Sequence, residues 1–202
     1  MKLYHCVGSR SVRVFWMLEE LGLRYEIEVL PFDPAALTSA DCIQLEGKGR
    51  VPVLVIDAVT MYESVPIVQY LLDHYADGRL EPPRGSDEYG VFLRWMTYGE
   101  ETLMGPVSKI ARNSYALPPA ERSATLLNEG KRRFKHFARK LEDALEQHDY
   151  LYDDQFTAAD IVVGYALYVA NEGGALPEDY PKLRAYYERL AARPAFKKAV
   201  AG

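Results

Sequence analysis

The sequence has few cysteines, no excess of basic residues and no long apolar run, and each shortage argues against a class of protein. Two cysteines, Cys6 and Cys42, are too few for a disulfide scaffold and favour a reducing compartment. The formal net charge of -5 argues against a nucleic-acid partner, because phosphate binding needs a basic surface. No apolar run approaches the roughly 20 residues that span a bilayer, and the N-terminal MKLYHC lacks the apolar segment of a signal peptide. We therefore expect a cytoplasmic protein with neither a membrane nor a nucleic-acid partner.

Histidine is also sparse, and the histidines are scattered along the chain. His5, His74, His136 and His148 show no spacing typical of metal ligands, and the sequence contains no cofactor motif. We expect no bound metal. What remains is ordinary: 49% hydrophobic and 26% charged residues are typical of a soluble globular protein that can bury a core.

The chain divides into two halves that differ in their secondary-structure signals. Residues 1–78 alternate strand and helix signals, whereas helical patterns follow one another through residues 87–202. Between them, residues 78–87 are rich in glycine and proline, as a linker is. The sequence therefore predicts an α/β domain at 1–78 and an all-α domain at 87–202.

Apolar spacing and turn residues predict a β-α-β-α-β-β-α order in the first half. Residues 25–30 alternate apolar and polar side chains, as a half-buried strand does, and Pro52 stands near the start of another strand, where proline is tolerated. The predicted strands are 2–6, 25–30, 51–56 and 60–62, and the predicted helices are 11–21, 39–45 and 64–75, the last capped by Ser64.

The second half begins with two long predicted helices, at 87–113 and 120–147. The tetrapeptide at 157–160, TAAD, is a capping-box pattern that opens an apolar helix. Two shorter helices, at 181–192 and 194–200, each have proline at their first position.

Chemistry-bearing side chains gather in the stretch HCVGSRSVR at residues 5–13, where a strand should turn into a helix. It contains a thiol, two hydroxyls and two guanidinium groups. The spacing of Cys6 and Ser9 superficially matches a redox motif, which would make Cys6 a thiol-disulfide reductant. A cysteine on a strand is more often a small buried apolar residue, so we favour the serines at the helix start as the functional groups.

Four local motifs occur in an order that is similar to one family. They are GRVPVL at 49–54, the pair ES at 63–64, FTAAD at 156–160 and the segment SRSVRV with LEELG within 9–22. Together with an α/β half followed by an all-helical half, they resemble the cytosolic glutathione transferases, particularly serine-type bacterial and fungal members. The resemblance implies a thioredoxin-like N-terminal domain that binds glutathione and an all-helical domain with an electrophile site.

The resemblance also implies ligands and partners. Glutathione would be the co-substrate, the second substrate would be a small and apolar electrophile, as in detoxification, and the chain would form a homodimer. By this resemblance the glutathione-binding residues are Arg50, Val51, Pro52, Glu63 and Ser64. Candidates for the second substrate are Tyr98, Thr102, Met104, Asn113 and Tyr165.

Each expected glutathione contact has a physical reason. By resemblance Pro52 would follow a cis peptide bond, which would leave the main chain of Val51 free to pair with an extended tripeptide. Ser64 at a helix start would hold the α-carboxylate of glutathione, and Glu63 would accept from its ammonium group. Arg50 would reach the glycyl carboxylate, with Lys48 as the alternative.

Glutathione must lose its thiol proton before it can react, and substitution, addition, ether cleavage and peroxide reduction all share this first step, so the sequence does not choose among them. Lowering a thiol pKa from about 8.5 by two units needs roughly 3 kcal/mol of preference for the thiolate. A hydroxyl donor contributes about 1.5–3 kcal/mol, and a helix N-terminus about 0.3–1 kcal/mol. Ser9 is our first choice for this donor and Ser11 the second, with Arg10 in support. The alternative function is a non-catalytic binding or regulatory protein of the same fold.

Overall fold

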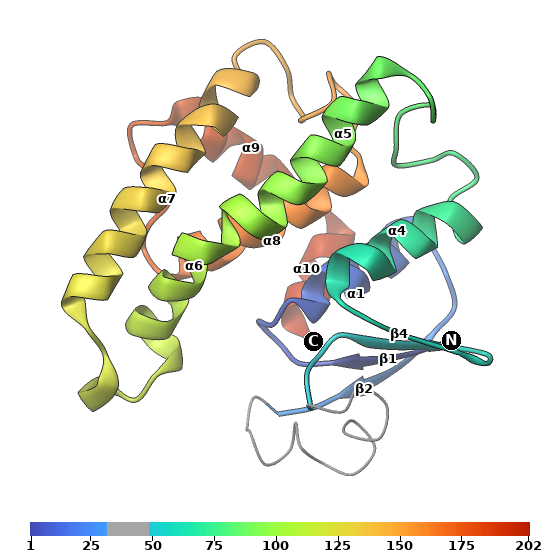
Figure 1. The fold of residues 1–202 in the computed structure, drawn as a ribbon, viewed down its shortest axis with the longest axis horizontal. Helices are drawn as coiled ribbons and strands as arrows, with labels where there is room; N and C mark the ends of the chain where they lie inside the picture. The colour runs from blue at the N-terminus through green and yellow to red at the C-terminus, as the bar shows by residue number, and fades with distance from the viewer. Residues whose placement is uncertain (32–48) are drawn as a thin grey trace. The chain divides into compact units, whose positions relative to one another are not determined.

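The computed structural model describes residues 1–31 and 49–202, which form two compact units (Figure 1). One unit comprises Met1–Arg79 together with Ala192–Gly202, and the other comprises Leu80–Ala191. The chain therefore returns to the first unit at its C-terminus, whereas the sequence pattern placed 87–202 in one helical domain. The predicted helix at 39–45, together with Cys42 and Lys48, lies outside the described residues.

The first unit contains a four-stranded mixed sheet in the order β2-β1-β3-β4. Its strands are β1 (Lys2–His5), β2 (Glu26–Val29), β3 (Val53–Ile56) and β4 (Val59–Tyr62). β1 and β2 are parallel, and β3 is antiparallel to both β1 and β4. A parallel pair needs a long crossover, and the helix between β1 and β2 provides it.

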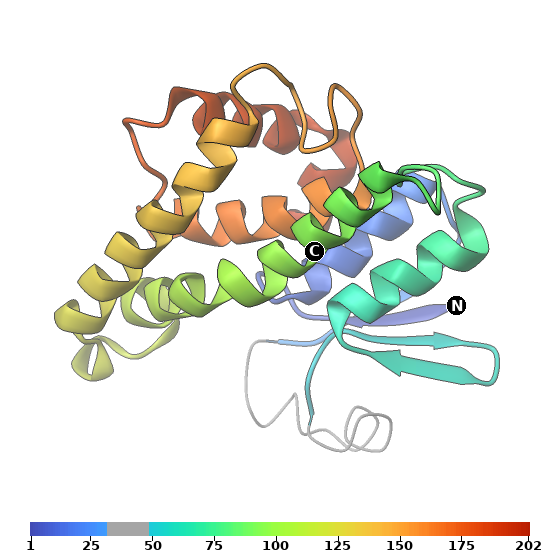
Figure 2. The same cartoon turned by 45° about the horizontal axis from the view of Figure 1, so that its top comes forward.

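Helices α1 (Ser11–Leu21) and α4 (Ser64–Tyr75) pack against each other and lie on the same side of the sheet (Figures 1 and 2). Both span the residues that the apolar spacing predicted. Helix α1 ends at Gly22, which has a φ of 67°, and the N–H groups of Gly22 and Leu23 donate to Glu19 and Leu18. Glycine adopts this left-handed conformation at little cost, so Gly22 itself determines where α1 ends.

Helix α10 (Pro194–Ala201) belongs to the first unit because it packs against α1. The rings of Trp16 and Phe196 meet edge to face, with 4.8 Å between their centroids. Just before α10, Arg193 donates to both carboxylate oxygens of Glu20 at 2.7 Å. This bidentate ion pair adds directional hydrogen bonds to the apolar contact between Trp16 and Phe196.

The second unit is all helical. Its elements are α5 (Asp87–Thr97), the π-turn η1 (Tyr98–Thr102), α6 (Met104–Ala111), the π-turn η2 (Arg112–Ala116), the short η3 (Pro119–Glu121), α7 (Ala124–Ala144), α8 (Ala158–Glu172) and α9 (Pro181–Ala192). The predicted helix at 87–113 is therefore interrupted once, by η1, and ends in the second π-turn, η2. In η1, a Cβ on Gly99 would lie 2.9 Å from Val162, so glycine permits the close approach of α8.

The capping box at the start of α8 is confirmed. Asp160 is fully buried and accepts from the N–H of Thr157 at 2.7 Å and from its hydroxyl at 3.1 Å. The same carboxylate accepts from Leu151 N–H and from the Tyr186 hydroxyl. One acidic residue thus links the start of α8 to the preceding loop and to α9. Within the described residues, no helix has the length and apolar character that crossing a membrane requires.

Candidate functional site

A pocket in the first unit is lined by the five residues that the resemblance implied as glutathione-binding, whereas Ser9 and Ser11 are not among its lining residues. It is formed where the start of α1, the loop before β3 and the turn from β4 to α4 meet. Its lining consists of Arg10, Arg50, Val51, Pro52, Tyr62, Glu63 and Ser64. Tyr62 was not singled out from the sequence; its position beside Glu63 at the end of a strand is the signal that could have found it.

The peptide bond between Val51 and Pro52 is cis, as the resemblance implied. The ladder between β1 and β3 pairs Tyr4 with Val53 and continues away from the pocket. Val51 therefore precedes the ladder and lies at the pocket wall.

The start of α4 differs from the sequence expectation. Glu63, not Ser64, is the N-cap residue, and Ser64 is the first residue of the helix, without a side-chain cap. The Ser64 hydroxyl accepts instead from Nη1 of the buried Arg13 at 3.1 Å. Ser64 was placed correctly at the helix start, but its hydroxyl binds to α1 rather than to its own helix.

Glu63 has an unusual backbone for a residue with a side chain, with φ at 71° and ψ at 119°. Such conformations cost about 1–3 kcal/mol and persist where surrounding structure enforces them, often at functional sites. Its carboxylate lies 3.7 Å from Arg50 Nη1, and both side chains are more than half exposed. An exposed pair of this kind contributes little to stability. Because both side chains are exposed, both charged groups are accessible to a ligand.

The turn from β1 to α1 separates its two serines. Ser9 is half-buried, and its Oγ accepts from the N–H of Ser11 at 3.2 Å. Ser11 is fully buried, and its Oγ lies 3.0 Å from Cys6 N and 2.7 Å from Ser9 Oγ. Ser11 is the first residue of α1, the N-cap residue is Arg10, and no side chain caps the helix there. The hydroxyl of Ser9 is the outer one of the pair.

Cys6 has the environment of a structural cysteine. It is 1% exposed, and burial raises the pKa of its thiol. Reactive cysteines have lowered pKa values and electropositive, accessible surroundings. The structure therefore argues against thiol-disulfide chemistry at Cys6.

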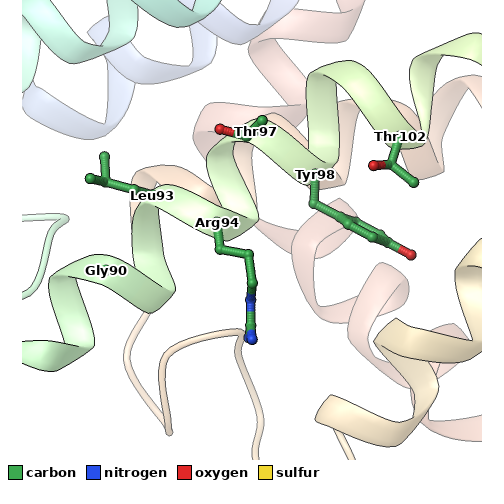
Figure 3. A pocket seen from close by; sticks show the side chains of 6 residues that line it. All are labelled: Gly90, Leu93, Arg94, Thr97, Tyr98 and Thr102. Atoms are coloured by element: carbon green, nitrogen blue, oxygen red, sulfur yellow. The ribbon is translucent and has the colours of Figure 1, made fainter.

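Two of the five candidates for the second substrate, Tyr98 and Thr102, line one pocket of the helical unit (Figure 3). The rest of its lining comes from Gly90, Leu93, Arg94 and Thr97. The Tyr98 hydroxyl donates to Phe137 O at 2.9 Å, and burial raises its pKa. Tyr98 is thus a neutral, hydrogen-bonded wall of this pocket.

Met104, Asn113 and Tyr165 are buried and do not line this pocket. The side chain of Asn113 donates to Lys109 O and accepts from Ser123 N–H, each at 2.8 Å. Asn113 therefore joins the end of α6 to the start of α7. Periodicity alone could not separate such core positions from pocket positions on the same helix.

Comparison with known proteins adds independent evidence. Residues 3–83 match the glutathione S-transferase N-terminal domain and residues 102–194 match the C-terminal domain. Glutathione S-transferase 3 of Schizosaccharomyces pombe is 27% identical over 98% of this chain and 85% of its own, and GstB of Escherichia coli is 27% identical over 93% and 91%. The theta class glutathione S-transferase of Xanthomonas axonopodis pv. citri, solved with glutathione bound, superposes with a TM-score of 0.89 at 27% identity over 100% and 97%. The chain belongs to the glutathione S-transferase family.

Proposed function

We propose that this protein activates the thiol of glutathione and directs it at a small, apolar electrophile. The observation that carries the proposal is the pocket in which Arg50, Val51, Pro52, Glu63 and Ser64 meet Arg10, the residue next to Ser9. The bound glutathione of the Xanthomonas relative supports the same ligand here.

In this proposal the pocket holds glutathione through its polar ends and its backbone. The main chain of Val51 pairs with the extended tripeptide. Glu63 accepts from the ammonium group, while Ser64 and the N-terminus of α4 bind the neighbouring carboxylate. Arg50 binds the glycyl carboxylate.

Ser9 is the proposed donor to the thiolate because its hydroxyl is the outer one of the serine pair. It would supply about 1.5–3 kcal/mol of the roughly 3 kcal/mol needed to ionise the thiol near neutral pH. Arg10, at the pocket wall, adds positive charge. The thiol proton passes to solvent.

The reaction class that we propose is substitution. The thiolate uses a lone pair to form a carbon–sulfur bond, and the leaving group departs with the electron pair of the bond that breaks. Tyr98 and Thr102 are the proposed contacts of the helical unit with an apolar electrophile, since they line a pocket that includes Leu93.

Ultraviolet difference absorption of bound glutathione tests the activation step. We expect wild type to show thiolate at pH 7 and Ser9→Ala to lose at least tenfold in thiolate fraction and turnover. Ser108→Ala, in α6, is the matched control and should behave as wild type. If wild type binds glutathione only as the thiol, or does not bind it, the protein is a non-catalytic member of the family and the proposal is wrong.

We propose further that the protein acts as a homodimer in the cytoplasm, as the family resemblance implies. Light scattering should give twice the mass of the chain. A single-chain mass across the micromolar range would contradict the homodimer.

A further inference from the structure

His5 is a buried titratable residue directly behind the proposed active serine. It is the last residue of β1 and is 0% exposed. Its Nδ1 lies 2.8 Å from Ser11 Oγ, and Ser11 Oγ lies 2.7 Å from Ser9 Oγ. The three side chains form a continuous line from the interior of the unit to the half-buried Ser9.

The hydroxyl of Ser11 can donate its proton either to Ser9 or to His5. It has one proton and two lone pairs, and the N–H of Cys6 occupies one lone pair at 3.0 Å. The distances from Ser11 Oγ to His5 Nδ1 and to Ser9 Oγ are both those of good hydrogen bonds. The other possible acceptor of the Ser11 proton, Cys6 O, is farther away at 3.2 Å. Donation therefore runs either outward, from His5 through Ser11 to Ser9, or inward, from Ser9 through Ser11 to His5.

The direction decides what Ser9 can do. If donation runs inward, the Ser9 proton is used by Ser11 and none remains for an anion. If donation runs outward, Ser9 Oγ accepts from the hydroxyl and the N–H of Ser11, and its own proton is available. Only the outward direction is compatible with Ser9 as a donor to a thiolate.

The far nitrogen of the imidazole distinguishes the two directions. His5 Nε2 is buried and has no hydrogen-bond partner among the described residues. The ring of Phe15 contacts the imidazole edge to face, with 5.2 Å between the centroids. A phenyl ring has no lone pair that could accept a conventional hydrogen bond from Nε2. The inward direction would place a proton on Nε2 as an orphaned donor, and orphaned buried N–H groups are rarer than unsatisfied acceptors. Burial also lowers the pKa of His5 to about 4, so near pH 7 only one nitrogen carries a proton.

We propose that His5, with its proton on Nδ1, is a positioning residue that donates to Ser11, which donates to Ser9, and so leaves the Ser9 proton for the glutathione thiolate. This inference rests on the proposed function of Ser9. Successive donors in one direction polarise one another, which strengthens the last bond in the chain.

The tautomer of His5 can be measured without any turnover. Proton–nitrogen correlation spectra of the imidazole rings distinguish Nδ1–H from Nε2–H, and comparison with His5→Asn assigns the signal of His5 among the four histidines. We expect ligand-free wild type at pH 7 to have the proton on Nδ1. A proton on Nε2 overturns the inference.

Two variants test the consequence for glutathione. His5→Leu removes the donor, and His5→Asn places an amide donor near the position of Nδ1. We expect His5→Leu to raise the pKa of the bound glutathione thiol by about one unit, a tenfold change in its ionisation constant, and His5→Asn to restore most of it. Circular dichroism confirms that both variants are folded; should His5→Leu not fold, the tautomer measurement alone decides.

The outcomes separate this inference from the proposed function. Thiolate in wild type together with an unchanged thiol pKa in folded His5→Leu overturns the role of His5 and leaves the role of Ser9 intact. Absence of thiolate in wild type overturns the proposed function, while the tautomer in the ligand-free protein still decides the direction of donation.

Discussion

Arg13 and Ser64 join the starts of the two helices that cover one side of the sheet. Nη1 of Arg13, in α1, donates to the hydroxyl of Ser64, the first residue of α4, at 3.1 Å, and both residues are buried. The bond connects residues 51 positions apart in the sequence. It ties α1, which follows the turn that contains Ser9, to α4, which begins at the proposed glutathione pocket.

Removing the acceptor of this bond should cost stability. In Ser64→Ala the buried Nη1 of Arg13 loses this acceptor, so the free energy of unfolding should fall by roughly 1–3 kcal/mol. Urea unfolding of Ser64→Ala and wild type measures the difference. Ser108→Ala, at a half-buried site in α6, is the control. Equal stability of Ser64→Ala and this control would mean that the bond contributes nothing.

The backbone of Glu63 should reverse the usual order of alanine and glycine. With φ at 71°, an alanine keeps the strain and a glycine relieves it. We therefore expect Glu63→Gly to be more stable than Glu63→Ala by about 1 kcal/mol in thermal or urea unfolding. Both should bind glutathione more weakly than wild type, because the carboxylate is lost.

A reference pair at Lys140, an exposed position in α7, completes this experiment. There Lys140→Ala should be more stable than Lys140→Gly by about 1 kcal/mol. The same order at both sites would show that Glu63 is not strained.

His5 should make stability depend on pH in the mildly acidic range. Burial lowers its pKa from 6.5 to about 4, so between these values the unfolded chain binds more protons than the folded one. Stability should therefore be highest above about pH 6.5 and fall by up to about 3 kcal/mol as the pH decreases toward 4. Urea unfolding at pH 7, 5.5 and 4.5 measures this slope.

The matched comparison is His5→Asn, in which this titration is absent. Its unfolding free energy should vary less steeply over the same pH range, whatever its stability at pH 7. Parallel slopes for wild type and His5→Asn would show that His5 is not the group responsible.

Cys6 should be dispensable for turnover. Because it is buried with a raised pKa, Cys6→Ala should keep kcat/KM with an electrophile within about threefold of wild type, apart from any loss of folded protein. Loss of activity in a folded Cys6→Ala variant would instead support the thiol-disulfide mechanism.

Local patterns predicted much of the architecture. The apolar spacing of 11–21 followed by Gly22 specified α1, and the pattern from Ser64 to Tyr75 specified α4. The capping box from Thr157 to Asp160 specified the start of α8. These signals depend on residues within one or two turns of each other, so they can be recognised without knowing what the helix packs against.

Long-range packing decided the remainder. The π-turn η1 within the predicted helix at 87–113, the π-turn η2 at its end and the return of α10 to the first unit have no local signature. Asn113 was grouped with pocket residues although its amide joins α6 to α7. The same polar side chain suits either role, and only its neighbours distinguish them.

The turn that contains Ser9 and Ser11 shows most clearly what the sequence determines and what only the tertiary structure determines. The sequence by itself determined that hydroxyls occupy a strand-to-helix turn in a chain that resembles the glutathione transferases, because turn chemistry and motif order are local properties. It left Ser9 and Ser11 as alternatives. Only the tertiary structure buried Ser11 between His5 and Cys6 and left Ser9 outermost, since burial depends on where β1 ends relative to α1 and not on the order of the residues.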